Sequence, residues 1–319
     1  MKRLCFFIVL LFSAVSLMAG NCETVVGNVD DRINAGRVEY QGVDYRPKRR
    51  ITSILLMGVD QESGESERER GFRNGGQADF LLLLVLDDNA KTVFPILLNR
   101  DTMTDITALT SFGVELGSWS AQLCLAHSFG DGREQSCVFT QKAVSGLLMD
   151  CRVDHYCAMF LNGISVLNDM LGGVEVYLED DFSIYDPDMI SGTTVVLQGK
   201  QAEVFLRNRY GIGSQDNVSR MGRQKQYLEN AKQSLEAKSN DNPAYVETLF
   251  NALEPFIVTD MGRGRSINLL DQARTYQWLP LRELTGEYAI GENGYVEFHA
   301  DDSSIREIVI EAFYMPLFS

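Results

Sequence analysis

Three apolar runs in the first third of the chain constrain its fold more than any other feature. Residues 51–58, 80–86 and 91–98 are rich in leucine and β-branched side chains and contain few polar residues. A strand with one wet face alternates polar and apolar residues, whereas a continuous apolar strand is buried on both faces. The sequence therefore predicts an α/β fold, a three-layer sandwich with a central mixed β-sheet flanked by helices.

The remaining pattern supplies the connections and the helices. Residues 87–90 (D-D-N-A) predict a hairpin turn between the second and third runs. We expect helices over residues 140–149, 158–171 and 224–239, with Gly172 and Gly173 ending the second of them. We also expect a strand over 174–178, a helix or turn beginning over 199–206, and a polar, glycine-rich loop over 61–78.

The N-terminus has the pattern of a targeting segment. Lys2 and Arg3 precede an almost unbroken apolar run from Leu4 to Gly20. We interpret residues 1–22 as a signal peptide or N-terminal membrane anchor, residues 23–48 as a linker, and residues 49–319 as an extracytoplasmic domain. The chain is then membrane-associated or secreted, and cleavage, retention and lipidation of the first segment remain open.

Four of the six cysteines, Cys124, Cys137, Cys151 and Cys157, lie close together in the sequence. Outside the cytoplasm they would form one or two disulfides or remain free buried thiols. Zinc binding is disfavoured, because there is no C-x-x-C pair and the nearest histidines have no regular spacing.

A cluster of arginines stands out because the chain is otherwise acidic. The net charge of −15 argues against nucleic-acid binding through a basic surface. Arg207 and Arg209 are two residues apart, so on an extended segment both would point to the same side and grip one pyrophosphate. Arg220 and Arg223 follow them. The alternative is a solvated helix start with scattered cations.

Acidic residues flank the apolar runs. Asp60 follows the first run, Asp79 begins the second, and Arg100 and Asp101 follow the third. Each aspartate alone is typical of a turn or a helix cap. Together, carboxylates that hold a divalent cation beside arginines are the means by which proteins neutralise a phosphoryl group. The residues predict a Mg²⁺-assisted site for a phosphate or pyrophosphate ester.

Six sequence blocks occur in order between about residues 51 and 226. They read I-L-L-M-G-V-D, A-D-F-L-L-L, L-L-N-R-D-T, L-N-D-M-L-G-G-V-E-V, L-R-N-R and D-N-V-S-R-M-G-R-Q. This order resembles the LytR–CpsA–Psr family of bacterial cell-wall proteins. The resemblance implies a membrane-anchored protein whose extracytoplasmic α/β domain transfers a glycopolymer from a polyprenyl-pyrophosphate carrier onto peptidoglycan, with Mg²⁺ at the pyrophosphate.

The resemblance also implies roles for single residues. The pair that resembles the Mg²⁺ ligands is Asp60 and Asp79. The residues that resemble the catalytic and pyrophosphate-binding set are Arg100, Asp101, Arg207 and Arg209, with Asp79 or Asp101 as the base. Those that resemble the polar block completing the substrate site are Asp216, Arg220, Arg223 and Gln224. Alternatives remain: Arg220 and Arg223 as helix-surface residues, and Asp101 as a helix cap.

Two positions depart from the family pattern. The family usually has an arginine two residues before the second aspartate and a small hydroxyl residue after it, where this chain has Gln77 and Phe80. The loss of one phosphate donor keeps two other functions open. One is a polyprenyl-pyrophosphate hydrolase with water as the acceptor, and the other is a non-catalytic binder of lipid-linked glycans.

Overall fold

The computed structural model describes residues 36–62, 75–110, 112–214, 217–242 and 245–317. Its elements separate into two compact units. The described part of the first unit comprises residues 58–62, 158–214, 217–242 and 245–274. The described part of the second unit comprises residues 36–57, 75–110, 112–157 and 275–317. The predicted domain, residues 49–319, therefore contains elements of both units.

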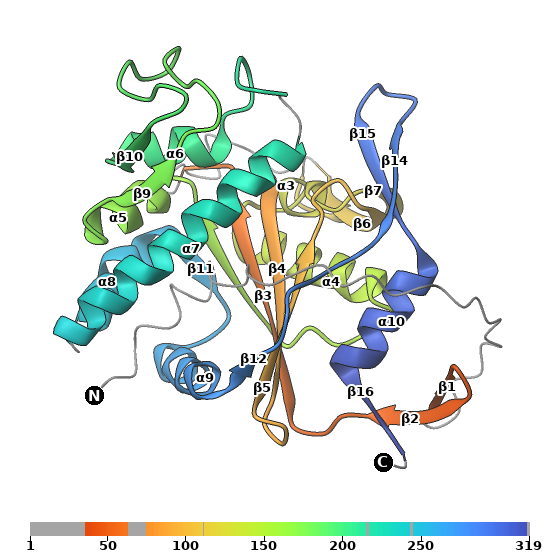
Figure 1. The fold of residues 1–319 in the computed structure, drawn as a ribbon. Coiled ribbons are helices and arrows are strands. Elements are labelled where there is room, and N and C mark those ends of the chain that lie inside the picture. The colour runs from red at the N-terminus through yellow and green to blue at the C-terminus, as the bar shows by residue number, and fades with distance from the viewer. Residues whose placement is uncertain (1–35, 63–74, 111, 215–216, 243–244, 318–319) are drawn as a thin grey trace. The chain divides into compact units, whose positions relative to one another are not determined.

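The three apolar runs form β3 (Ile51–Val59), β4 (Ala78–Asp87) and β5 (Thr92–Leu98), as predicted. β4 and β5 pair antiparallel across the expected turn, whereas β12 (Gln277–Trp278) and β13 (Arg282–Glu283) run parallel to β5. With β8 (His155–Phe160) and β11 (Ile257–Thr259), the sheet has the order β11–β8–β3–β4–β5–β12 (Figure 1). The predicted mixed sheet with flanking helices is confirmed.

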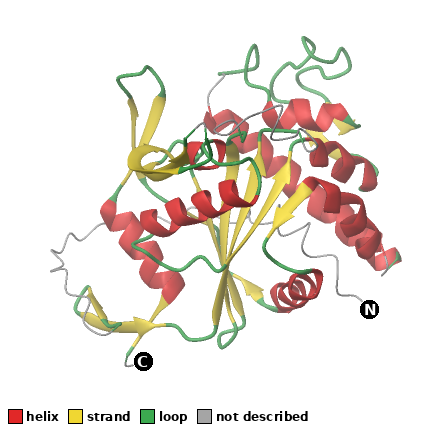
Figure 2. Cartoon of the chain, turned by 180° about the vertical axis from the view of Figure 1, so that it is seen from behind, coloured by secondary structure: helices red, strands yellow, loops and turns green. Residues whose placement is uncertain are grey.

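The other elements of the second unit pack around β4 and β5. The hairpin of β6 (Met103–Leu109) and β7 (Glu115–Gln122) contacts α3 (Leu125–Ser128) and α4 (Glu134–Leu147). A second hairpin, β14 (Gly286–Ile290) and β15 (Val296–Ala300), leads into α10 (Asp302–Phe313) and projects beyond it (Figure 2).

A small sheet lies where the sequence predicts a linker. β1 (Val38–Tyr40) and β2 (Val43–Pro47) fall within residues 23–48 and pair with β16 (Tyr314–Pro316) near the C-terminus. Gln41 and Gly42 connect β1 and β2 with φ angles of 51° and 75°. Two consecutive left-handed residues give the tight turn that hairpins favour.

The first unit consists mainly of helices around a two-stranded sheet. β9 (Val174–Tyr177) pairs antiparallel with β10 (Thr194–Leu197) and packs against α7 (Asn217–Asp241). α5 (Asn162–Met170) contacts α6 (Lys200–Arg207) and α8 (Tyr245–Leu253), and η1 (Glu254–Phe256) and α9 (Arg263–Thr275) follow. Gly172 and Gly173 end α5 with φ angles of 84° and 89°, as predicted.

Several predicted element bounds are wrong. The helix predicted over 158–171 begins only at Asn162, because the preceding residues belong to β8. A short buried apolar run has no periodicity that distinguishes a strand from a helix. The helices predicted over 140–149 and 224–239 begin earlier, at Glu134 and Asn217. Most of the loop predicted over 61–78 lies outside the described residues, and its last residue begins β4.

The membrane and cysteine predictions have different outcomes. The apolar run predicted as a targeting segment lies outside the described residues. No helix in the described part of the chain is long and apolar enough to cross a membrane. Cys124, Cys137, Cys151 and Cys157 are buried and none of them is in a disulfide, so of the two alternatives the structure has buried thiols.

Candidate functional site

Arg100 is the centre of a buried polar cluster in the second unit, made of Arg100, Gln77, Asp79, Asp101 and Cys124. The β4–β5 register pairs Leu81 with Leu98, and the same register two residues further on brings Asp79 to Arg100. The Arg100 guanidinium forms an ion pair with Asp79 and donates a hydrogen bond to Gln77 Oε1. Its Nε lies 3.2 Å from Asp101 Oδ1, and its Nη2 lies 3.0 Å from Cys124 Sγ.

The electrostatics of the Arg100 cluster favour a permanent cation and a neutral thiol. Burial alone would lower the pKa of Arg100, but Asp79, Cys124 and Asp101 raise it, and the net shift is upward. Burial raises the pKa of Cys124 to about 12, although Arg100 opposes that shift. The Cys124 thiol is therefore protonated at neutral pH and is a poor nucleophile.

The donor set of the cluster fits a cation and an incoming phosphate. Two carboxylates beside one guanidinium leave one net negative charge. Mg²⁺ in phosphoryl-transfer sites is commonly held by one or two carboxylates together with substrate phosphate oxygens. Among the described residues no group of three or more histidines, cysteines or acids could hold a metal ion.

Residues that the sequence interpretation did not identify hold this cluster in place. Asn99 Oδ1 accepts a hydrogen bond from the Asp101 backbone N–H at 3.0 Å, and Gln122 Nε2 lies 3.4 Å from Asp101 Oδ1. The helix-cap alternative for Asp101 is wrong, because β6 follows it. Asn99 lies within the L-L-N-R-D-T block, but nothing in the sequence relates the distant Gln122 and Cys124 to Arg100.

Arg207 and Arg209 belong to the first unit and are both exposed. Arg207 is the last residue of α6, and Nη2 forms an ion pair with Asp60 Oδ1 at 2.8 Å. The extended geometry that would point both arginines to the same side therefore does not include Arg207. Asn208 has extended dihedral angles and lies between the two arginines. Asp60 belongs to the first unit and Asp79 to the second.

Arg223 is buried in α7 and closes the C-terminal end of α6. Its Nε donates to the Phe205 carbonyl at 2.8 Å and its Nη2 to the Asn208 carbonyl at 2.6 Å. Gln224 Nε2 lies 3.4 Å from the Leu206 carbonyl. The last carbonyls of a helix have no partner within the helix, so these side chains supply donors that the end of α6 needs.

The burial of Arg220 and Arg223 also excludes the alternative that these two arginines lie on a helix surface. The exposed fractions of Arg220 and Arg223 are 2% and 9%. Asp216, the remaining predicted member of this block, lies outside the described residues.

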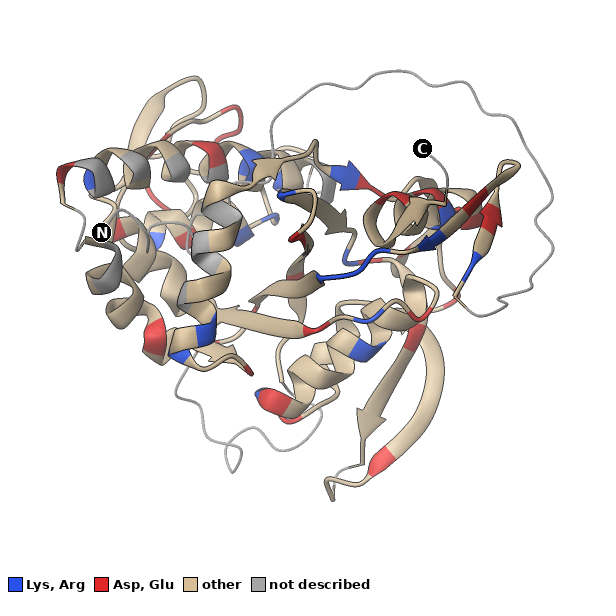
Figure 3. Cartoon of the chain, turned by 90° about the horizontal axis from the view of Figure 1, so that it is seen from below, with Lys and Arg blue, Asp and Glu red and all other residues tan. Residues whose placement is uncertain are grey.

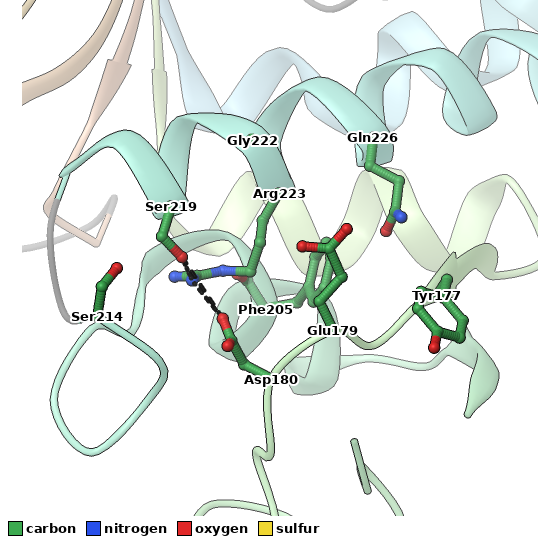
Figure 4. A pocket seen from close by; sticks show the side chains of 9 residues that line it. All are labelled: Tyr177, Glu179, Asp180, Phe205, Ser214, Ser219, Gly222, Arg223 and Gln226. Atoms are coloured by element: carbon green, nitrogen blue, oxygen red, sulfur yellow. Dashed lines mark hydrogen bonds and ion pairs between the residues drawn. The ribbon is translucent and has the colours of Figure 1, made fainter. Parts of the chain in front are cut away.

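A polar pocket of about 300 Å³ lies beside Arg223 in the same unit. Figure 4 shows Ser219, Asp180 and Arg223 converging at its wall. Arg223 Nη1 lies 3.2 Å from Ser219 Oγ and 3.8 Å from Asp180 Oδ2, and its guanidinium lies 5.3 Å from the Phe182 ring centroid. The sequence interpretation missed Asp180 and Phe182, because no motif includes them.

Elsewhere in the described chain, basic and acidic residues are interspersed (Figure 3).

Comparison with known proteins agrees with the resemblance. The chain is 25% identical to the polyisoprenyl-teichoic acid–peptidoglycan teichoic acid transferase TagU of Bacillus licheniformis, over 97% of this chain and 95% of that protein. Its fold is similar to that of gbs0355 from Streptococcus agalactiae (TM-score 0.65, 21% identity, 82% of this chain and 86% of that chain). It is also similar to that of B. subtilis TagV (TM-score 0.59, 21% identity, 83% and 96%). The model of the LytR_cpsA_psr family matches residues 21–311, and the chain therefore belongs to this family.

Proposed function

We propose that this chain is a Mg²⁺-dependent phosphotransferase that moves a glycopolymer from a polyprenyl-pyrophosphate carrier onto peptidoglycan. The observation that carries the proposal is the Arg100 cluster, in which a buried guanidinium is held between two carboxylates. The similarity to TagU, whose name describes this transfer of teichoic acid, extends over nearly the whole of both chains and supports the same reaction class.

The proposed reaction exchanges one phosphorus–oxygen bond for another. A sugar hydroxyl of peptidoglycan attacks the phosphorus nearer the glycan, its proton passes to Asp79 or Asp101, and polyprenyl phosphate leaves. The enzyme's contribution is mainly orientation and charge neutralisation by Arg100, Arg207 and Arg209. Mg²⁺, when bound, would add further neutralisation of phosphate charge, and Asp60 and Asp79 are the carboxylates that we propose hold it.

The proposed location is the extracytoplasmic face of the membrane. Its support is the sequence pattern of residues 1–22, two cations followed by an apolar run, which is typical of a signal peptide or an anchor. The carrier lipid and peptidoglycan are then on the same side of the membrane as the domain.

Product analysis tests the proposal. The full-length chain in mild detergent is incubated with Mg²⁺ and a short-chain polyprenyl-pyrophosphoryl sugar, with and without a peptidoglycan oligomer, and products are followed by mass spectrometry. We expect sugar phosphate joined to the oligomer. Release of sugar phosphate and polyprenyl phosphate into water alone would identify a hydrolase, and saturable binding without turnover would identify a non-catalytic binder.

A substitution at position 77 distinguishes the hypothesis of a transferase from that of a non-catalytic binder of lipid-linked glycans. Gln77 accepts a hydrogen bond from Arg100 through its amide oxygen, so the residue already has a role in the cluster. We expect Gln77→Arg to lower transfer about tenfold, because a second guanidinium repels Arg100 and removes its acceptor. The measurement is the initial rate of transfer. A gain of activity in Gln77→Arg would favour a binder that has lost its chemistry.

A substitution at Arg209, which belongs to the first unit, tests the prediction that this side chain binds the pyrophosphate. We expect Arg209→Ala to lower kcat/KM at least thirtyfold, about 2 kcal/mol of transition-state stabilisation, because one charged donor to the phosphates is lost. The matched control is Arg46→Ala, which removes an exposed arginine from β2. Full transferase activity in Arg209→Ala would refute this role.

A further inference from the structure

The pocket beside Arg223 lies within the first unit, and one of its walls is a single face of α7. Ser219, Gly222, Arg223 and Gln226 line this wall, at positions i, i+3, i+4 and i+7 of the helix. Residues with this spacing share one face of a helix. The other lining residues come from β9 and the segment after it, from α6 and from the loop before α7, and they are Tyr177, Glu179, Asp180, Phe205 and Ser214 (Figure 4).

Gly222 leaves the middle of the α7 wall without a side chain. A Cβ atom added at Gly222 would meet no atom within 4 Å, so close packing does not require a glycine there. Glycine in the interior of a helix costs about 0.5–1 kcal/mol relative to alanine. The missing side chain instead leaves room for a ligand beside Arg223.

The amide of Gln226 carries an acceptor that the protein does not satisfy. Gln226 Oε1 is buried and has no hydrogen-bond partner among the described residues. A buried acceptor without a donor costs about 1–3 kcal/mol, and native proteins contain few of them. Because Gln226 lines the pocket, a donor on a bound molecule would supply the missing hydrogen bond (Figure 4).

The charged groups of the pocket favour a ligand that donates hydrogen bonds. Glu179 and Asp180 contribute two carboxylates, against the single guanidinium of Arg223. Carboxylates accept hydrogen bonds and donate none. Arg223 already donates to the carbonyls of Phe205 and Asn208. The carboxylates repel a phosphate, so the pocket does not suit the charged part of a polyprenyl pyrophosphate.

A sugar ring has the groups that complement this lining. Sugar hydroxyls donate to carboxylate and amide oxygens, and the hydroxyls of Ser214 and Ser219 can both donate and accept. Tyr177 is 49% exposed and offers an aromatic ring on which the C–H face of a pyranose packs. The volume of about 300 Å³ is at the lower end for ligand pockets, which suits a single sugar. A metal ion fits less well, because the described part of the chain has no group of three or more histidines, cysteines or acids that could hold one.

The pocket adjoins the segment that carries Arg209. A Cβ atom added at Gly213 would lie 2.5 Å from Asp180 Oδ1, so the segment passes directly against that carboxylate. Ser214, the next residue, lines the pocket, and at the other end Arg223 holds the carbonyl of Asn208. A molecule in the pocket therefore lies against residues at both ends of the segment that carries Arg209.

We propose that this pocket binds one uncharged sugar of the substrate glycan. Hydroxyls of the sugar donate to the carboxylates of Glu179 and Asp180 and to Gln226 Oε1. The inference rests on the proposed function, since the glycan is one of the two that the reaction joins. The lipid-linked donor and the peptidoglycan acceptor both contain uncharged sugars, and the KM values of the two substrates distinguish these sources.

Direct binding of simple sugars tests the pocket without turnover. The full-length protein, in a detergent without a sugar head group, is titrated with the methyl β-glycosides of N-acetylglucosamine, glucose and galactose, and binding is followed by saturation-transfer NMR. We expect saturable binding of at least one glycoside. Gly222→Leu fills the pocket and Gln226→Met removes the amide, so each is expected to raise the dissociation constant about tenfold, or about 1.4 kcal/mol.

Matched variants separate the loss of a ligand contact from the loss of the fold. Gln233→Met removes an exposed glutamine from the same helix, and Gly146→Leu adds a side chain to an exposed glycine of α4 with nothing within 4 Å of its Cβ position. Both are expected to leave the affinity unchanged. The melting temperatures of Gly222→Leu and Gln226→Met are expected not to fall, because leucine favours a helix more than glycine does and an unsatisfied acceptor is removed.

Transfer kinetics identify the substrate to which the sugar belongs. In Gln226→Met we expect the KM of one substrate to rise about tenfold while kcat stays within about twofold of wild type, because the contact lies away from the reacting phosphorus. A higher KM for the lipid donor assigns the sugar to the donor glycan. A higher KM for the peptidoglycan oligomer assigns it to the acceptor.

The outcomes distinguish this inference from the proposed function. Glycoside binding that weakens in both Gly222→Leu and Gln226→Met, in a protein that catalyses no transfer, supports the pocket and refutes the transferase. Transfer with both KM values unchanged in Gln226→Met supports the transferase and overturns the inference. Absence of glycoside binding by the wild type also overturns it, as does unchanged affinity in both variants. Tighter binding of glucose 6-phosphate or glucosamine than of glucose would contradict an uncharged ligand.

Discussion

Arg100→Met is expected to lower kcat/KM for transfer by about 10²–10³-fold, or about 2.7–4 kcal/mol, because it removes a prepositioned cation from a site poor in water. The side chain of Arg100 is 11% exposed, and those of Asp79 and Asp101 are 15% and 9% exposed. Removal of the guanidinium leaves both carboxylates with little solvent and without their cation. We therefore also expect lower stability, by about 3 kcal/mol, in urea unfolding.

Two further variants test whether the loss of activity in Arg100→Met is specific to the guanidinium of Arg100. Arg100→Lys keeps the charge but lacks the planar fork that contacts Asp79 and Gln77 together, so its activity is expected to lie between those of wild type and Arg100→Met. Arg282→Met removes the ion pairs of Arg282 with Glu307 and Glu311 and is expected to affect stability but not turnover. Unchanged kcat/KM in Arg100→Met would refute the Arg100 cluster as the reacting site.

The approach of Asp79 to Arg100 could be predicted from the sequence, because local rules determine the geometry of this part of the cluster. A short turn after β4 leaves one antiparallel register for β5, and that register brings Asp79 to Arg100. The partners Gln122 and Cys124 come from beyond β6 and β7. Their approach depends on how that hairpin packs, which no local pattern in the sequence specifies.

The arginine segment of the first unit was harder to predict. The sequence K-Q-A-E-V-F-L-R contains good helix formers and becomes α6, so Arg207 ends a helix rather than lying on a strand. The sequence also suggested that Arg223 either touches substrate or lies on a helix surface. Its burial against the end of α6 arises from tertiary packing of α7 on α6, which residue spacing does not reveal.

Arg223→Met is expected to lower kcat/KM for transfer about 10²-fold without any contact between Arg223 and the substrate. Arg223 holds the carbonyls of Phe205 and Asn208, which flank Arg207 in the chain and lead to Arg209. The unsatisfied carbonyls cost about 1–3 kcal/mol, and the end of α6 is released. We expect a lower melting temperature together with the loss of activity, whereas Arg265→Met, an exposed arginine in α9, changes neither.

A double-mutant cycle distinguishes this positioning role from direct substrate contact. If Arg223 acts by placing Arg209, the effect of Arg223→Met largely disappears in an Arg209→Ala background, because the side chain that it positions is already gone. Arg223→Lys is expected to restore little, since an ammonium does not span the two carbonyls with the geometry of the guanidinium fork. Additive losses in the double mutant would contradict the positioning role, because they would show that Arg223 and Arg209 act on the reaction independently.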